Sequence, residues 1–202
     1  NQVSKIVKYC NAKIIPITPS AALTGLSGGA LPLHGGVSMS FKKMNKILDI
    51  NPRSFQAIVE PGLINEEFQN EISKYGLFYP PDPASKGSCT LGGNISLNAG
   101  GPRAVKYGVT SNFVLNLEVV LPDGKIIWTG ANTLKNATGY NITQLMVGSE
   151  GTLGIVTKAV LKLLSLPKKN ILMLVPFSKI EEACKVVSQI FLDGIFPSCI
   201  EF

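Results

Sequence analysis

The apolar residues of this chain recur either every three to four positions, as in helices, or at every second position, as in strands. Val3, Ile6, Val7 and Cys10 follow the helical period, and residues 114–121 follow the alternating one. We expect helices at residues 3–10, 43–47, 64–75 and 180–192. We expect strands at residues 14–17, 37–41, 56–59, 114–121, 125–129, 155–164, 171–175 and 200–202.

Glycine-rich stretches interrupt this pattern at residues 24–36, 87–101 and 148–154. The second lies within residues 80–108. The residues there are too small and too turn-prone for a core element, and the stretch is too long for a simple connection between elements. Where side chains are missing, backbone N–H groups approach a ligand closely, and such donors suit phosphate. A ligand that spans all three stretches should be long and carry a diphosphate, which favours a dinucleotide.

Two glycine motifs of other protein classes fit poorly. Residues 25–29, GLSGG, lack the spacing and the following helix of a Rossmann fingerprint, and we regard Asp49, which lies where its acidic residue would be, as accidental. They do match G-x-S-x-G, so a serine hydrolase with Ser27 as nucleophile is an alternative. The one histidine, His34, follows Ser27 by seven residues with no acid between them, so no triad is visible.

Composition narrows the function further. The net charge of +6 comes from scattered lysines without aromatic interleaving, which disfavours nucleic acid as a partner. The four cysteines show no paired spacing, so we expect buried or free thiols, with Cys89 a buried one, and no metal site. No apolar run suits a transmembrane segment and no secretory signal is recognisable, so we expect a cytoplasmic protein.

Five motifs then carry a specific resemblance. The chain resembles the FAD-linked oxidases with the vanillyl-alcohol oxidase fold and a PCMH-type FAD-binding domain, in the branch of the glycolate oxidase D subunit and D-lactate dehydrogenase. The motifs are PSAALTGLSGGA (19–30), LGGN (91–94), NAGGPR (98–103), KYGVT (106–110) and VGSEGTLGI (147–155).

The resemblance implies an α+β fold. It predicts a bipartite FAD-binding domain at residues 1–167, with a small parallel α/β part and a larger antiparallel sheet with helices, its N-terminal edge incomplete. Residues 168–202 would be the incomplete start of an α+β substrate (cap) domain, since LPKKN at residues 166–170 reads as a linker.

The same resemblance assigns cofactor contacts position by position. The first glycine stretch would surround the pyrophosphate, the second would lie against the flavin and ribityl chain, and the third would hold the adenosine end. With no histidine at the family's attachment point, FAD should be bound non-covalently. The implied residues are Ser20, Ala21, Ala22, Leu23, Thr24, Gly25, Ser27, Gly92, Gly93, Asn98, Gly100, Gly101, Glu150, Gly151, Gly154, Ile155 and Val156.

One motif departs from the family. Members commonly read PRGAGT where residues 19–24 read PSAALT, so an arginine and two glycines are replaced by Ser20, Ala21 and Leu23. If either glycine position has a positive φ, its replacement costs about 1 to 2 kcal/mol, and Leu23 would also shield amides that face phosphate. Weakened FAD retention follows as an expectation, and an FAD-free interaction module with the same fold is the alternative.

The implied activity is that of a flavin-dependent 2-hydroxy acid dehydrogenase or oxidase of the glycolate or D-lactate type. Hydride passes from the hydroxyl-bearing carbon to flavin N5, while a histidine and a metal of the later domain handle the proton and the carboxylate. A 2-hydroxy acid and an electron acceptor or iron–sulfur subunit are the implied partners. We expect no catalytic residue in this chain and little activity from it alone.

Overall fold

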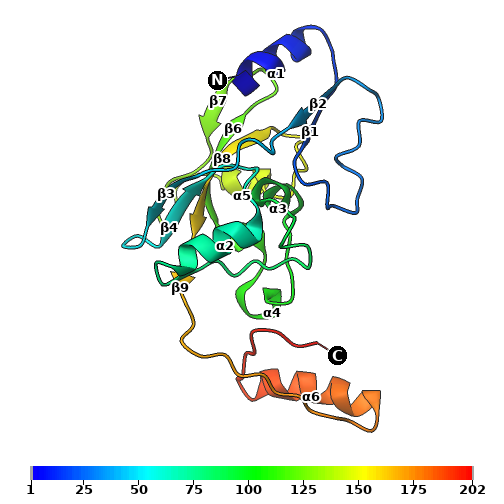
Figure 1. Cartoon of the computed structure of the whole chain (residues 1–202), viewed down its shortest axis with the longest axis vertical. Helices are drawn as coiled ribbons and strands as arrows, with labels where there is room; N and C mark the ends of the chain where they lie inside the picture. The colour runs from blue at the N-terminus through cyan, green and yellow to red at the C-terminus, as the bar shows by residue number, and fades with distance from the viewer. Residues whose placement is uncertain (1, 202) are drawn as a thin grey trace.

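The structure, a computed structural model, describes residues 2–201 (Figure 1). The helices are α1 (Gln2–Ala12), α2 (Asn65–Ser73), α3 (Leu91–Leu97), α4 (Ala104–Tyr107), α5 (Ile142–Met146) and α6 (Ile180–Leu192), with a 3₁₀ turn η1 (Thr110–Phe113). The strands are β1 (Ile17–Ser20), β2 (Val37–Ser40), β3 (Ile47–Asn51), β4 (Gln56–Val59), β5 (Leu77–Phe78), β6 (Val114–Val120), β7 (Ile126–Trp128), β8 (Ile155–Lys162) and β9 (Leu164–Ser165).

A five-stranded antiparallel sheet forms the centre, with the strand order β3-β4-β8-β6-β7. The β6–β7 hairpin closes at the predicted turn, where Gly124 has a φ of +79° and the Asp123 carboxylate accepts the Lys125 amide at 2.9 Å. That backbone hydrogen bond holds the pKa of Asp123 below its ordinary value. The predicted hairpin is therefore confirmed.

A smaller parallel sheet, β1 beside β2, packs under α1 at one end of the molecule (Figure 1). Val3 and Val7 of α1 join Met39, Val120 and Ile155 in one apolar cluster, which ties the parallel pair to the end of the large sheet. The predicted α+β architecture, with a small parallel part and a larger antiparallel part, is thus confirmed.

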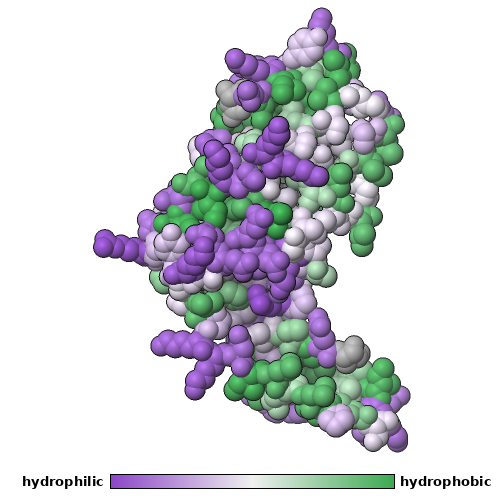
Figure 2. All heavy atoms as spheres, in the orientation of Figure 1, coloured by the Kyte–Doolittle hydropathy of each residue, from purple (hydrophilic) through white to green (hydrophobic). Residues whose placement is uncertain are grey.

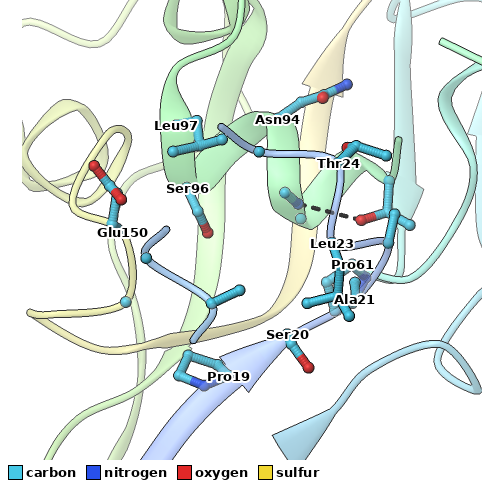
Figure 3. Close-up of a pocket in the computed structure, with 18 of the residues that line it drawn as sticks. Pro19, Ser20, Ala21, Leu23, Thr24, Pro61, Asn94, Ser96, Leu97 and Glu150 are labelled. Atoms are coloured by element: carbon cyan, nitrogen blue, oxygen red, sulfur yellow. Dashed lines mark hydrogen bonds between the residues drawn. The ribbon is translucent and has the colours of Figure 1, made fainter. Parts of the chain in front are cut away.

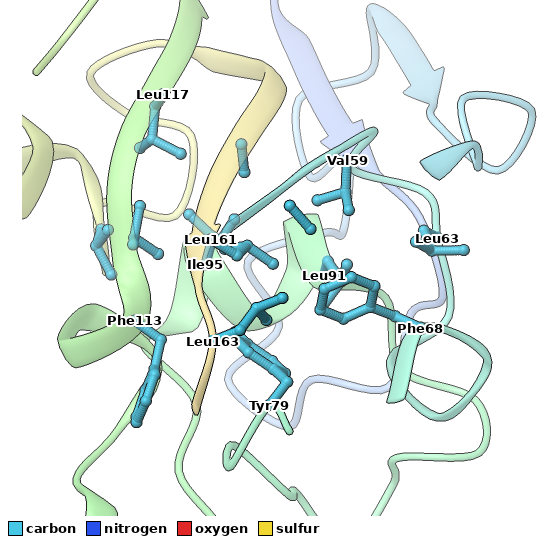
Figure 4. Close-up of a cluster of buried hydrophobic side chains, with 14 of the residues drawn as sticks. Val59, Leu63, Phe68, Tyr79, Leu91, Ile95, Phe113, Leu117, Leu161 and Leu163 are labelled. Carbon is cyan, nitrogen blue, oxygen red and sulfur yellow. The ribbon is translucent and has the colours of Figure 1, made fainter. Parts of the chain in front are cut away.

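The main core lies between the large sheet and the helices α2 and α3 (Figure 4). Phe68, Tyr79 and Phe113 stack edge to face within it, with ring centroids 5.3 and 5.9 Å apart along the series. Tyr79 is fully buried, and burial raises the pKa of its phenol well above the ordinary value. Its hydroxyl has no hydrogen-bond partner among residues 2–201, so the ring acts in packing.

The expectation that residues 80–108 hold no core element is wrong. They contain α3, whose Leu91 and Ile95 are one turn apart and almost completely buried. Thr90 caps the helix by accepting the Gly93 amide at 3.3 Å. In α3, Leu91 and Ile95 are the two large residues that face the core. Because their neighbours are small, the sequence shows no clear helical period there.

Two other expected elements are also wrong. Residues 43–47 form no helix, because Ile47 begins β3 and pairs with Val59 of β4; a short apolar run fits either element until a partner is known. Residues 171–175 form no strand, since no described residue pairs with them. The first strand begins at Ile17 rather than at Ile14, which has a φ of +53° and is 92% exposed.

The last part of the chain bears α6 at the predicted residues 180–192. Exposed apolar side chains gather over α6 and residues 171–175 in the lower lobe of the surface (Figure 2). Residues 200 and 201 belong to no strand, and Phe202 lies outside the described residues. The domain boundary near residue 167 stays a prediction.

Candidate functional site

A cavity of about 480 Å³ lies where three segments distant in the sequence meet (Figure 3). We call residues 19–31 the first segment, residues 90–99 the second and residues 148–156 the third. The first follows β1, the second contains α3, and the third leads into β8. The volume is in the range of cofactor pockets, and most of the lining side chains are small or apolar.

Fourteen of the seventeen predicted contact residues line this cavity. They are Ser20, Ala21, Ala22, Leu23, Thr24, Gly25, Ser27, Gly92, Gly93, Glu150, Gly151, Gly154, Ile155 and Val156. The structure therefore brings the three glycine stretches together, as a single elongated ligand requires. Whether each residue contacts the ligand stays a prediction.

Asn98, Gly100 and Gly101 do not line the cavity. Asn98 ends α3 with a φ of +50°, and its Oδ1 accepts the Ser111 amide at 2.9 Å. The backbone of Gly101 lies so close to the Asp82 carbonyl that a side chain would collide with it. In this structure these residues position the end of the second segment.

The first segment presents a continuous run of unpaired backbone donors. None of the amides of residues 21–27 donates a hydrogen bond to another of residues 2–201. All seven residues line the cavity, and all of them except Leu26 were expected at the site. Unpaired amides on a concave surface favour an anion such as a phosphate. This run is the feature of the cavity best suited to a diphosphate.

The second segment behaves differently because its amides are already paired. Gly92 N donates to the Pro61 carbonyl at 2.7 Å, and Gly93 N donates to Thr90 Oγ1. Asn94 Nδ2 donates to Asn65 Oδ1 at 3.2 Å, which fixes α3 against α2. The second segment thus offers a close backbone surface rather than anion donors, which suits a flat ring.

Sequence reasoning missed lining residues from distant parts of the chain, among them Phe41, Pro61 and Ser85. No motif marks Phe41 or Pro61, because their place in the cavity depends on how β2 and β4 end. Asn94 lies inside the LGGN motif, so its position could have been inferred from the resemblance.

The serine hydrolase alternative finds no support in this geometry. Ser27 Oγ donates to Glu150 Oε2 at 3.3 Å, and the cavity lining contains no histidine. His34 lies on an exposed loop outside the lining. A triad needs a histidine base beside the serine, so Ser27 has no activating partner here.

Comparison with known proteins agrees with the geometry. Residues 1–130 match the family model described as FAD binding domain. The chain belongs to the FAD binding domain family. Its cofactor is therefore FAD.

Relatives of this FAD binding domain include oxidoreductases. D-lactate dehydrogenase of Anaerostipes hadrus is 44% identical over 201 residues, which cover 100% of this chain and 42% of that protein. Glycolate oxidase subunit GlcD of Bacillus subtilis (strain 168) is 44% identical over 202 residues, 100% of this chain and 43% of that protein. The chain thus spans about two fifths of the length of these relatives.

A solved structure shares the fold of this FAD binding domain. Alkyldihydroxyacetonephosphate synthase superposes with a TM-score of 0.82 at 25% identity, over 98% of this chain and 36% of the synthase. The resemblance inferred from the motifs, to FAD-linked oxidases with a bipartite FAD-binding domain, is confirmed.

The FAD binding domain has an unusual charge distribution at its cavity. Among residues 2–201, Glu150 is the one lining residue with a charged side chain, and none of the lysines or arginines described lines the cavity. The family's arginine position is occupied by Ser20, so the diphosphate would be held by neutral donors. Neutral amides can bind phosphate, but without the added attraction of a cation.

Of the three residues that depart from the family motif, Leu23 is the one with a strained backbone. Its φ is +62°, a region where a β-carbon is crowded, whereas Ala21 has no positive φ. The side chain is 62% exposed beside the cavity and does not fill it. Of the two missing glycines, only the one at position 23 therefore has a conformational cost.

Two absences in the described part of the chain bear on the site. No group of three or more His, Cys, Asp or Glu residues among residues 2–201 could hold a metal ion. None of the helices described is long and apolar enough to span a membrane. Cys10, Cys89, Cys184 and Cys199 are all free thiols, the first two buried as expected for Cys89.

Proposed function

We propose that this chain is the FAD-binding part of a flavin-dependent 2-hydroxy acid dehydrogenase or oxidase of the glycolate or D-lactate type. The observation that carries the proposal is that residues 21–27, whose amides are unpaired within the described chain, line a cavity shared by all three segments. The names of the relatives, a D-lactate dehydrogenase and a glycolate oxidase subunit, support the substrate class.

The paired and unpaired amides suggest a division of roles. The first segment would hold the diphosphate, the second would pack against the flavin and ribityl chain, and the third would hold the adenosine end. FAD would be non-covalent, since the lining contains neither histidine nor cysteine and Cys89 is buried outside it. Bound FAD supplies a hydride acceptor.

Whole-protein properties belong to the same proposal. A 2-hydroxy acid would be the substrate, and an electron acceptor, such as an iron–sulfur subunit, would reoxidise the flavin. We also propose a cytoplasmic location, which the four free thiols support because reducing compartments preserve them.

We predict that this chain alone, loaded with FAD, does not oxidise D-lactate or glycolate at a measurable rate. Oxidation of a hydroxyl group needs a base for the proton, and among residues 2–201 Glu150 of the third segment is the one ionisable side chain that lines the cavity, with its carboxylate at Ser27 of the first segment. Anaerobic bleaching of the flavin by substrate is the measurement. Rapid bleaching would contradict the assignment of the base to another part of the protein.

Placing a negative charge among the unpaired amides should abolish tight FAD binding. Ala22 lines the cavity and is half-buried, so the carboxylate of Ala22→Asp would repel the diphosphate and compete for its donors. We expect FAD affinity to fall by about 10- to 100-fold relative to Ala22→Asn, which has nearly the same shape without the charge. Flavin fluorescence titration of the FAD-free protein measures both.

Equal affinities for the two Ala22 variants would place the diphosphate elsewhere. No FAD binding by the unaltered protein, together with capture of a partner protein, would instead support the FAD-free interaction module.

A further inference from the structure

The side chain of Glu150 crosses from the third segment to the first. Its Oε2 accepts the Ser27 hydroxyl at 3.3 Å and lies directly over Gly29, where a β-carbon would overlap the carboxylate. We call this contact of Glu150 with Ser27 and Gly29 the Glu150 bridge. The absence of a side chain at Gly29 is what allows the carboxylate to lie there.

The backbone that carries Glu150 is firmly held. Glu150 N donates to the Ser96 carbonyl at 3.0 Å, and Gly148 N donates to the Ile95 carbonyl at 2.9 Å. Both acceptors belong to α3, whose Ile95 is buried in the main core. Glu150 also has a φ of +51°, which points to a backbone fixed by its surroundings. The bridge is therefore anchored in the core on one side.

The first segment has few attachments of its own. Residues 21–27 donate no backbone hydrogen bonds within the described chain, and the nearest backbone bonds at either end are Phe41 N to Ser20 O and Leu31 N to Gly28 O. A connection of this kind should sample many conformations unless another contact orders it. The Glu150 bridge is the side-chain hydrogen bond that reaches residues 21–30.

We propose that Glu150 is a positioning residue, which orders the first segment so that its unpaired amides face the cavity before the cofactor arrives. This inference rests on the proposed function and assigns a way in which this chain prepares its binding site. Ordering the segment in advance lowers the entropy lost on binding, so FAD binds more tightly. The carboxylate acts here through its hydrogen bond and its packing over Gly29, and a neutral acceptor can do the same.

The test combines backbone mobility with affinity. In the FAD-free protein, Glu150→Ala should lower the ¹⁵N order parameters of residues 21–29, and its FAD affinity should be about three- to tenfold lower than that of Glu150→Gln, which is equally neutral. Glu150→Gln keeps an oxygen acceptor for Ser27, so its order parameters should stay near those of the unaltered protein, while its affinity should be equal or higher because a negative charge has left the cavity. Glu67→Ala, which removes an exposed carboxylate on α2, is the control and should change neither.

Gly29→Ala tests the same contact from the other side. Gly29 has no positive φ, and the colliding atom is the mobile end of a side chain, so the fold should persist while the carboxylate is displaced. Its order parameters should fall as in Glu150→Ala, its FAD affinity should be lower than that of the unaltered protein, and the double variant should bind FAD no more weakly than Gly29→Ala alone.

Two outcomes would overturn the inference. Unchanged order parameters in Glu150→Ala would show that the segment is ordered without the bridge. A loss of order in Glu150→Gln as large as that in Glu150→Ala would show that Glu150 acts through its charge and not through a hydrogen bond that a neutral acceptor can replace. The mobility measurement needs no flavin, so failure of FAD to bind would refute the proposed function separately.

Discussion

Replacing Leu23 with glycine should raise the free energy of unfolding by about 1 kcal/mol and tighten FAD binding about three- to tenfold. Leu23 has a φ of +62°, where a β-carbon costs about 1 to 2 kcal/mol. Glycine removes that cost. Its greater conformational freedom in the unfolded chain offsets about 0.5 to 1 kcal/mol of the resulting gain in stability. Tighter FAD binding is expected because the sequence predicts that Leu23 shields amides that face phosphate. Denaturant unfolding and FAD titration measure the two effects.

Leu26→Gly is the matched control for this prediction. Leu26 lies in the same segment and is fully exposed, at 102%, but it has no positive φ. Glycine there should lower stability slightly, because only the entropy cost remains. A gain in stability at position 26 equal to that at position 23 would show that backbone strain at Leu23 is not the cause.

Gly92→Ala should destabilise the protein by about 2 to 3 kcal/mol and weaken FAD binding strongly. A β-carbon at Gly92 would lie 2.5 Å from Pro61 Cβ and 2.8 Å from the Pro61 carbonyl oxygen, both in buried and inflexible surroundings. Relief requires α3 to move away from residue 61, and that shift displaces the second segment from the cavity. Thermal unfolding without FAD and titration with FAD report the two effects.

Gly93→Ala separates this clash from the general effect of alanine in a helix. Gly93 is in the same first turn of α3, and its β-carbon would meet only Thr90 Oγ1 at 3.3 Å. The gain in helix propensity, about 1 kcal/mol, is similar at both positions. We therefore expect Gly93→Ala to stay within about 1 kcal/mol of the unaltered protein. An equal loss of stability in Gly92→Ala and Gly93→Ala would mean that the close contact of α3 with Pro61 does not govern stability.

Local patterns predicted those elements that depend on few distant partners. The helix at residues 180–192 and the β6–β7 hairpin could be inferred because apolar spacing and the turn residues Asp123 and Gly124 act within the segment itself. The helix α3 was missed, since its short glycine-containing sequence is stabilised by packing of Leu91 and Ile95 in the core. The strand β3 was not predicted, and its first residue, Ile47, was assigned to a helix, because pairing with β4 decides its conformation.

The residues of the candidate site likewise divide into those that the sequence predicted and those that depend on tertiary packing. The motifs that carry the resemblance pointed to fourteen lining residues, most of them small, as a ligand that needs bare backbone requires. They did not reveal Phe41 or Pro61, whose side chains reach the cavity only through the packing of separate elements. The resemblance also placed Asn98 and Gly101 at the ligand, which stays a prediction; in this structure they do not line the cavity and support the loop that follows α3.

The amino-acid sequence by itself determined the family, the cofactor and the order of the three glycine-rich segments, because these depend on residue types at fixed spacing. Only the tertiary structure decided which amides are free to bind an anion, that Leu23 rather than Ala21 has the strained backbone, and that Glu150 reaches Ser27 and Gly29. Hydrogen-bond pairing depends on which segments meet in the folded chain, and the contact of Glu150 with Ser27 joins residues 123 positions apart, which no local pattern records.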